Sequence, residues 1–321
     1  MYDVIGLGEV LIDFTPAGQD TRGRELFAQN PGGAVANVLA MNALLGGHCA
    51  FMGKVGDDGF GQFLRVSLTN CGVDCHGLAV SRSIPTTLAF VHPDSRGDRS
   101  FTFYRKPGAD ILLEEREVNR SILENCRFFH FGGVSLTDEP LRSTTLAAVD
   151  YARSHGALIS YDPNYRAPLW RDESLAAFEL LSPLSEVDIL KVSDEEMTLL
   201  TGVTDLSAGA EILAGNGPAL VLVTLGEQGA FYYTRFLQGL LPAFPVKAAD
   251  TTGAGDAFLG TLLYCLRGKK CREDLESLTQ RELREAVRYA VAAGSLTTTS
   301  AGAIPAMPSL EQIRSLADSA V

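Results

Sequence analysis

The feature that most constrains the fold is a regular alternation of short apolar runs and amphipathic segments in the second half of the chain. Longer segments with helical periodicity separate the apolar runs. Because parallel strands need a crossover connection, usually a helix, this rhythm predicts a mostly parallel central sheet with helices on both faces, a three-layer α/β/α sandwich. The predicted strands are 128–131, 158–161, 189–192 and 220–223.

The first third of the chain holds similar elements. A short buried strand is expected at 4–8, before a turn. Helical patterns run over 34–45, where Gly46 and Gly47 stop the helix, and over 60–69. These elements extend the same α/β architecture toward the N-terminus.

Two segments interrupt this alternation of predicted strands and helices. Residues 14–30 are polar and irregular, whereas 86–105 contains two strand-like runs, 88–91 and 101–104, around a turn expected at 93–98. These segments predict a small antiparallel sheet apart from the main layer. A small sheet beside a ligand cleft is typical of a lid.

The net negative charge of the chain limits which classes of binding partner are expected. Its 321 residues carry a formal charge of −12, so nucleic acid and acidic membrane surfaces are not expected as partners. The charge does not exclude ATP, because a local cradle of N–H groups can hold phosphate in an acidic protein. There is no leader-like start and no run of about 18 apolar residues, so a cytoplasmic location is expected.

The pattern of cysteines also favours a reducing compartment. The chain has six cysteines and no CxxC pair. Cys71, Cys75 and His76 lie close in sequence, but no further His or Cys completes a zinc site near them. Free, mostly buried thiols in a reducing compartment are therefore expected.

The most informative motif is a run of small and polar residues that leads into an apolar helical stretch at 257–266. Small residues let a ligand approach the main chain, and a helix that starts here directs its free N–H groups toward the loop. A carboxylate beside such a phosphate site can accept a proton from an attacking hydroxyl. Alternatively, Asp256 is only a helix N-cap. The run is Asp250-Thr251-Thr252-Gly253-Ala254-Gly255-Asp256.

A second glycine-rich stretch leads into the helix expected at 34–45. Gly32 and Gly33 could bring backbone amides against a sugar hydroxyl, and Asn37 could both donate and accept hydrogen bonds. Asp13 lies just past the first strand, where α/β sheets keep their ligand contacts. The alternative is a plain loop with a polar residue inside the helix.

Three common nucleotide-binding motifs are absent. Leu11 stands where GxGxxG needs its third glycine. A P-loop ending at Lys54 would need a glycine at His48 and a hydroxyl at Val55. The protein-kinase signature set is also missing.

The two glycine-rich stretches together resemble the two signatures of the ribokinase-like (PfkB) carbohydrate kinases, and within that family the chain looks most like fructokinases. The likeness covers essentially the whole chain and keeps the order and spacing of both signatures. The stretches that carry it are Gly32-Gly33-x-x-x-Asn37, Leu45-Gly46, Gly53 to Gly61, Asp250 to Asp256, Gly8 to Phe14, Phe103-Tyr104-Arg105, Ser160 to Arg166, Leu190 to Glu196, and Gly302 to Pro305.

The resemblance implies a single ribokinase-like domain over 1–321, with a lid from about 14–30 and 84–108. It implies that ATP and Mg²⁺ bind, with K⁺ as a further candidate ion. Because a lid with exposed strands often pairs with a second copy, a homodimer through the lid is also expected. The resemblance also implies a set of site residues. The catalytic residues would be Asp256, Gly253, Ala254, Gly255 and Arg166. The sugar would contact Asp13, Gly32, Gly33, Asn37, Phe103, Arg105 and Asp256, and the nucleotide would contact Lys191, Thr224, Gly226, Gly229, Gly253 and Gly255. Glu196 would act on Mg²⁺ through water, and Asp250 and Thr252 would hold a monovalent cation.

Ser193 departs from the family pattern. The family usually carries Asn-x-x-Glu in the segment that organises magnesium and phosphates, whereas here Ser193 precedes Glu196. A serine hydroxyl is shorter than an amide and cannot bridge in the same way. Arg166 also has a plain alternative, which is an ion pair with a surface carboxylate.

The resemblance implies transfer of the ATP γ-phosphoryl group to a primary hydroxyl of fructose. The family's 2-keto-3-deoxygluconate kinases tend to have Tyr two residues before the lid arginine, and Phe103 at that place favours a neutral ketose. Ribose, nucleosides and tagatose remain alternative substrates. A non-catalytic sugar sensor, or a binding module of unknown ligand, is the alternative from another class.

Overall fold

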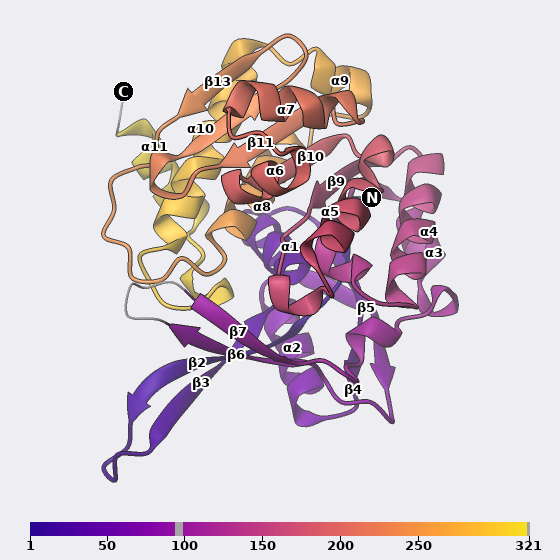
Figure 1. The fold of residues 1–321 in the computed structure, drawn as a ribbon, viewed down its shortest axis with the longest axis vertical. Helices are drawn as coiled ribbons and strands as arrows, with labels where there is room; N and C mark the ends of the chain where they lie inside the picture. Colours follow the sequence, from indigo (N-terminus) through magenta and orange to yellow (C-terminus); the bar gives the residue numbers. More distant parts are fainter. Residues whose placement is uncertain (94–98, 320–321) are drawn as a thin grey trace.

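A nine-stranded sheet forms the centre of the molecule in the computed structural model, which describes residues 1–93 and 99–319 (Figure 1). Seven neighbouring strands are parallel, and two antiparallel strands extend one edge. The strands are, in sheet order, β13 (Gln238–Leu241), β12 (Ala230–Tyr233), β11 (Leu220–Thr224), β10 (Ile189–Ser193), β9 (Leu158–Asp162), β8 (Cys126–Gly132), β1 (Tyr2–Leu7), β4 (Cys49–Gly56) and β5 (Val73–Ser81).

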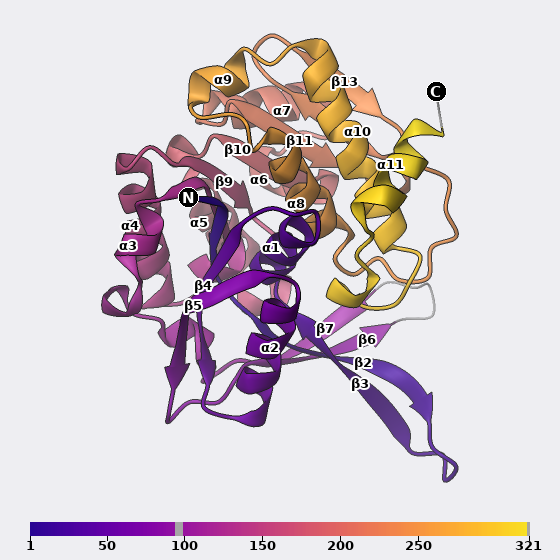
Figure 2. The same cartoon turned by 180° about the vertical axis from the view of Figure 1, so that it is seen from behind.

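Helices cover both faces of this sheet, so the predicted three-layer sandwich is confirmed (Figures 1 and 2). One face packs against α1 (Ala34–Leu44), α2 (Gly59–Asn70), α8 (Ala254–Leu266), α9 (Arg272–Glu276) and α10 (Gln280–Thr297), with α11 (Leu310–Asp318) behind them. The other face packs against α3 (Arg120–Leu123), α4 (Leu141–Ser154), α5 (Glu173–Leu181), α6 (Asp194–Thr201) and α7 (Leu206–Gly215).

Alternation along the strands sends neighbouring side chains into different cores. Phe128 packs in one core, whereas Phe129 and Phe131 pack in the other. A strand buried on both faces reads as a continuous apolar run, which is why the four predicted strands appear in the sequence as unbroken hydrophobic segments.

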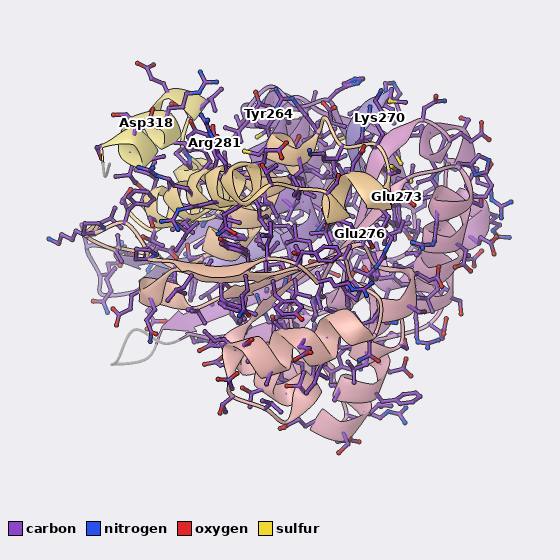
Figure 3. All side chains as sticks on the ribbon, turned by 90° about the horizontal axis from the view of Figure 1, so that it is seen from above. Tyr264, Lys270, Glu273, Glu276, Arg281 and Asp318 are labelled. Atoms are coloured by element: carbon purple, nitrogen blue, oxygen red, sulfur yellow. The ribbon has the colours of Figure 1, made fainter. Side chains whose placement is uncertain are left out.

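The outer surface over α9, α10 and α11 is charged. Lys270, Glu273, Glu276, Arg281 and Asp318 are all exposed there (Figure 3). Among helices in the described part of the chain, none has the length and hydropathy needed to cross a bilayer.

A second, four-stranded sheet stands apart from the central one, with a hairpin that projects from the body (Figure 1). Its order is β3 (Glu25–Gly32), β2 (Leu11–Gln19), β6 (Leu88–Pro93) and β7 (Arg99–Tyr104). The strand-like runs predicted near 88–91 and 101–104 are confirmed. The turn predicted at 93–98 falls mainly on residues 94–98, which lie outside the described residues.

Residues 14–30 belong to the predicted small sheet, since most of them lie in the antiparallel strands β2 and β3. One expectation was wrong: the sheet is mixed rather than wholly antiparallel, because β2 runs parallel to β6. Phe14 of β2 stacks on Phe90 of β6 with ring centroids 4.9 Å apart. This aromatic pair gives the two strands an apolar contact.

Helices α1 and α8 pack closely at Gly260. A Cβ atom at this position would lie 2.5 Å from the carbonyl oxygen of Val38 and 2.8 Å from Cβ of Met41. The Asn42 side chain donates to the Gly260 carbonyl at 3.0 Å in the same contact. The absence of a side chain at Gly260 therefore sets the separation of the two helices.

We expect Gly260→Ala to lower the free energy of unfolding by about 1–3 kcal/mol. Alanine favours a helix over glycine by about 1 kcal/mol, but the clash involves backbone that no rotamer can relieve. Urea denaturation would measure the change. Gly268→Ala is the matched control, since a Cβ there meets nothing within 4 Å, and it should change stability by less than about 0.5 kcal/mol. Equal stabilities for the two variants would contradict the close contact.

Candidate active site

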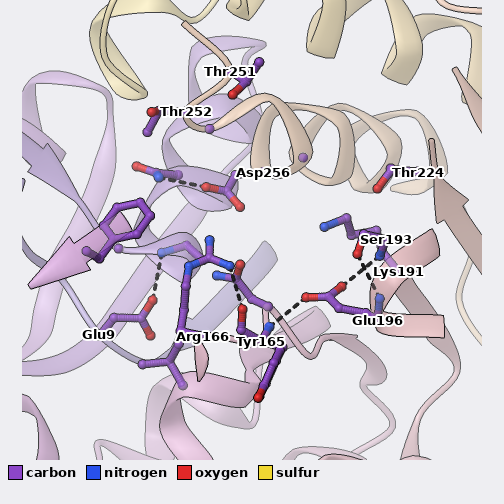
Figure 4. A pocket seen from close by; sticks show the side chains of 18 of the residues that line it. Glu9, Tyr165, Arg166, Lys191, Ser193, Glu196, Thr224, Thr251, Thr252 and Asp256 are labelled. Carbon is purple, nitrogen blue, oxygen red and sulfur yellow. Dashed lines mark hydrogen bonds between the residues drawn. The ribbon is translucent and has the colours of Figure 1, made fainter. Parts of the chain in front are cut away.

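A cavity of about 710 Å³ lies at the carboxyl ends of the parallel strands, where α/β sheets bind their ligands (Figure 4). The central sheet contributes Lys191 and Ser193 from β10 and Thr224 from β11. The small sheet contributes Phe101 and Phe103 from β7. The first turns of α1, α6 and α8 complete its walls, so three helix N-termini converge on one space.

The glycine-rich loop before α8 presents backbone N–H groups to this cavity. Gly253 is the N-cap and has φ of 77°, a left-handed conformation that favours glycine. The N–H of Ala254 bonds weakly to the Thr251 carbonyl at 3.3 Å, and the first α-helical bond runs from Ala257 to Gly253. The amides of residues 255 and 256 fall in the first turn, where a helix has no partners of its own for them.

Asp256 is not the N-cap, because it lies inside the first turn of α8. Its carboxyl group lines the cavity and accepts a hydrogen bond from the amide of Asn37 at 2.8 Å. Burial and the nearby Asp162 carboxylate raise the pKa of Asp256 to about 6, while Asn37, Lys191 and Arg166 act in the opposite direction. At neutral pH this group is an ionised carboxylate with the basicity that suits a general base.

Lys191 is buried beneath the loop and pairs with Asp162 at 3.0 Å. Its ammonium group lies 3.0 Å from the position that a Cβ atom of Gly255 would take, directly under the first turn of α8. Burial favours the neutral amine, but the surrounding Asp162, Glu196 and Asp256 carboxylates raise the pKa of Lys191 above its usual value. The cavity floor therefore holds a fixed positive charge.

Ser193 and Glu196 form a capping box at the start of α6. The Ser193 hydroxyl accepts from the Glu196 N–H at 3.1 Å, and the Glu196 carboxylate accepts from the Ser193 N–H at 2.8 Å. The other Glu196 oxygen accepts from the Tyr165 N–H at 2.7 Å. Serine is a good N-cap, so Ser193 has a structural role at the start of α6. Burial raises the pKa of Glu196, and Lys191 opposes this effect.

The residues expected to bind sugar gather on the opposite wall. Asp13, Gly33 and Asn37 line the cavity. Gly32 does not line it but lies under the Asp13 carboxylate, where a Cβ atom would overlap an Asp13 oxygen. Gly33 is the N-cap of α1 with φ of 108°, a conformation that favours glycine, and the first turn of this helix lines the cavity.

The lid residues divide into two groups. Phe103 lines the cavity beside Phe101, whereas Tyr104 faces away and is 62% exposed. Arg105, expected to contact substrate, is not at the cavity surface. It is buried, donates to Asp110 at 2.7 Å and bonds to the Thr137 hydroxyl at 2.7 Å. In this structure Arg105 anchors the end of β7 to the body.

Arg166 lines the cavity, as expected of a residue that contacts substrate. Among the described residues it forms no ion pair, so the plain alternative of a surface salt bridge is not seen. Its guanidinium donates to the Tyr165 carbonyl at 3.0 Å and lies 5.7 Å from the centre of the Phe101 ring.

The residues expected at the nucleotide and ion sites lie in two places. Thr224 lines the cavity, whereas Gly226 and Gly229 form the turn between β11 and β12 outside it. The Asp250 carboxylate accepts from the N–H groups of Thr252 and Gly302, at 2.7 and 2.9 Å. The Thr252 hydroxyl oxygen is buried without a hydrogen-bond partner among the described residues.

All six cysteines are free thiols. Cys71, Cys75 and His76 do not gather into a metal site, and within residues 1–93 and 99–319 no cluster of three or more His, Cys, Asp and Glu side chains does so. His76 instead bonds to Asp74 at 2.5 Å.

Sequence reasoning gave no role to two acidic residues of the site, Glu9 and Asp162. Glu9 is buried under the first turn of α1, where one carboxyl oxygen accepts from the Ala34 N–H at 2.8 Å and the other has no partner among the described residues. Asp162 pairs with Lys191. A signal existed for this pair, because a lysine within an apolar strand buried on both faces requires a carboxylate on a neighbouring strand.

We expect the stability of the protein to depend on pH through Glu9. Burial raises the pKa of Glu9 to about 7, whereas in the unfolded chain its pKa is about 4.3. Between these values the folded protein retains a proton that the unfolded chain has released, so this group's contribution to stability falls as pH rises. Glu9→Gln cannot ionise yet keeps an acceptor for Ala34.

The free energy of unfolding of Glu9→Gln, relative to that of the parent protein, should therefore increase by on the order of 2 kcal/mol between pH 5 and pH 8. Urea denaturation at several pH values measures this difference, in which other titrating groups cancel. A difference that stays constant across the range would show that Glu9 is ionised throughout.

Comparison with known proteins assigns the family. Residues 1–310 match the profile of the "pfkB family carbohydrate kinase". The chain is 43% identical over 321 residues to Fructokinase-1 of Oryza sativa subsp. japonica, and this match covers 99% of this chain and 98% of the relative. A fructokinase from Xylella fastidiosa, solved with bound ATP, superposes with a TM-score of 0.91 at 34% identity and covers 99% of both chains. A fructokinase double mutant from Vibrio cholerae O395, solved with fructose, ADP and potassium ion, gives 0.86 at 32% identity, over 98% of this chain and 97% of that one. The chain belongs to the pfkB family of carbohydrate kinases.

Proposed function

We propose that this protein is an ATP-dependent fructokinase that transfers the γ-phosphoryl group to a primary hydroxyl of fructose. The observation that carries the proposal is the position of Asp256, an ionisable carboxylate in the first turn of α8, between the free amides of that helix and the polar wall formed by Asp13 and Asn37. A base, an anion cradle and hydroxyl-binding side chains thus share one cavity. The fructokinase relatives support the choice of sugar.

In the proposed mechanism, Asp13, Gly33 and Asn37 hold the sugar so that one hydroxyl faces Asp256, which takes its proton as that oxygen attacks the γ-phosphorus. The amides of residues 253–256, at the positive end of α8, bind the negative charge of the transferring group, and Arg166 approaches it from the opposite wall. Lys191 supports the same charge from below.

The chain also offers positions for the ions that a nucleotide kinase uses. Mg²⁺ would neutralise the triphosphate and orient it for in-line transfer. Glu196 suits this ion through water, because both of its oxygens are held by backbone N–H groups and each keeps acceptor capacity toward the cavity.

We assign Asp250 and Thr252 to a monovalent cation, because the unpartnered Thr252 oxygen is a suitable ligand for K⁺ next to a fixed carboxylate. The potassium ion in the Vibrio fructokinase structure supports the choice of ion. Replacing K⁺ by tetramethylammonium at constant ionic strength should lower kcat about tenfold or more, and Thr252→Val should remove most of that dependence. Activity that does not respond to K⁺ would refute the assignment.

The wall around the sugar favours a neutral ketose, because Phe103 faces the cavity and Arg105 is already paired with Asp110. An acidic sugar would find no free guanidinium at that position. An ADP-release assay with fructose, ribose, 2-keto-3-deoxygluconate and a nucleoside tests the substrate. Fructose should give the highest kcat/KM; a higher value for another sugar would change the substrate and leave the kinase reaction in place.

We expect Asp256→Asn to fold normally and to lose at least about 10³-fold in kcat, because the amide cannot accept the hydroxyl proton. Binding of ATP, followed by calorimetry, should change little, since the loop amides remain. Wild-type turnover by the folded variant would remove Asp256 from the role of base and, with it, the proposed mechanism.

The proposal includes one ribokinase-like domain over residues 1–321, with a lid from about 14–30 and 84–108. The four-stranded sheet of β2, β3, β6 and β7, which begins at Leu11 and extends to Gly32 in its first hairpin, would form this lid. The exposed Leu26, Phe27 and Tyr104 side chains and the open edges of β3 and β7 favour a homodimer through this sheet. Sedimentation that shows a monomer at micromolar concentration would exclude the dimer. Six free thiols suit the cytoplasm, which imaging of a tagged chain would check.

A further inference from the structure

Asn37 makes two different connections within the site. It lies in the first turn of α1 and is only 4% exposed. Its Nδ2 donates to Oδ2 of Asp256 at 2.8 Å, while its Oδ1 is buried and has no partner among the described residues. Because an ionised carboxylate only accepts hydrogen bonds, the amide nitrogen must be the atom that faces Asp256, and the amide oxygen is the atom left for a ligand.

The contact between α1 and α8 keeps this arrangement rigid. The two helices meet at Gly260, and Asn42 of α1 donates to the Gly260 carbonyl of α8 at 3.0 Å. Two asparagines of one helix therefore bridge to the other, one to its backbone and one to its carboxylate. The backbones that carry Asn37 and Asp256 are fixed by packing outside the cavity, so neither side chain has to order the other on its own.

We propose that Asn37 is the positioning residue of the reaction. Its side-chain amide binds a sugar hydroxyl and the base at the same time. Oδ1 accepts a hydrogen bond from a sugar hydroxyl while Nδ2 holds Oδ2 of Asp256. The other carboxylate oxygen, Oδ1 of Asp256, is thereby directed to the hydroxyl that is phosphorylated. This inference rests on the proposed role of Asp256 as base and assigns Asn37 more than sugar binding.

The charged groups around Asp256 make the coupling measurable. Asp162 from β9 faces it with like charge, and Lys191 from β10 and Arg166 from the segment after β9 face it with opposite charge. Asn37 is the neutral group in this set that bonds directly to the carboxylate, and it lowers the pKa of Asp256. A hydrogen bond to a charged group contributes about 1.5–3 kcal/mol, which corresponds to about one pH unit or more in the titration of the carboxyl group.

The decisive experiment measures kcat/KM for the sugar against pH, at saturating ATP, for Asn37→Ala and Asn37→Asp. In the parent enzyme the acid limb should fall near the pKa of Asp256, about 6. Asn37→Ala should move this limb upward by about one pH unit and raise KM about tenfold, because it removes both hydrogen bonds. Asn37→Asp keeps an acceptor for the sugar but places a second carboxylate beside Asp256, so its limb should move further than that of Asn37→Ala.

Asn42→Ala is the matched control. It removes the other amide that bridges α1 to α8, so it should lower the melting temperature while leaving the acid limb in place. An acid limb that stays at the parent position in folded Asn37→Ala, with KM alone raised, would reduce Asn37 to a sugar ligand and overturn the inference. An unchanged KM with a shifted limb would overturn the sugar contact. If Asp256→Asn is inactive in the same assay, either failure leaves the proposed kinase mechanism standing.

Discussion

The site depends on a buried ammonium group that lies among three carboxylates. Lys191 pairs with Asp162, and the charges of Glu196 and Asp256 also reach it. Three buried carboxylates need an opposing charge, because burial disfavours their ionised forms; it raises the pKa values of Glu196 and Asp256. The lysine allows a negatively charged base to lie beside a site for phosphate. It comes from the central strand β10, and its ammonium group lies under the first turn of α8.

Much of the fold could be read from the sequence, because strands buried on both faces appear as continuous apolar runs. The four predicted strands of the second half coincide with β8 to β11. The small sheet was harder to predict. Strand β2 contains a proline and a glycine, and besides β3 it pairs with β6, whose partner residues lie 76 positions further along the chain, as Leu88 does from Ile12. Local propensity carries no information about such a partner.

The site was predictable where motifs specify backbone, and less so where long side chains choose between partners. The loop before α8 and the start of α1 lie where the glycine patterns predicted, because glycines with positive φ cap both helices. Arg105 shows the limit. Its position at the end of a lid strand suggests a substrate contact, but a buried Asp110 that follows five residues later binds the guanidinium instead. The sequence contains both residues and no indication of which partner is preferred.

The three helix N-termini around the cavity are chemically different, and this difference explains why phosphate would bind at only one of them. The first amide of α1 already donates to Glu9, and the first turn of α6 is occupied by the reciprocal bonds of Ser193 and Glu196. At α8 the cap is a glycine with no side-chain hydrogen bond, and the carboxylate in its first turn is bonded to Asn37 instead of to its own amides. At two of the helix starts, groups of the chain itself thus already accept hydrogen bonds from first-turn amides, whereas the third remains available to an incoming anion, directly next to the group that would deprotonate the acceptor.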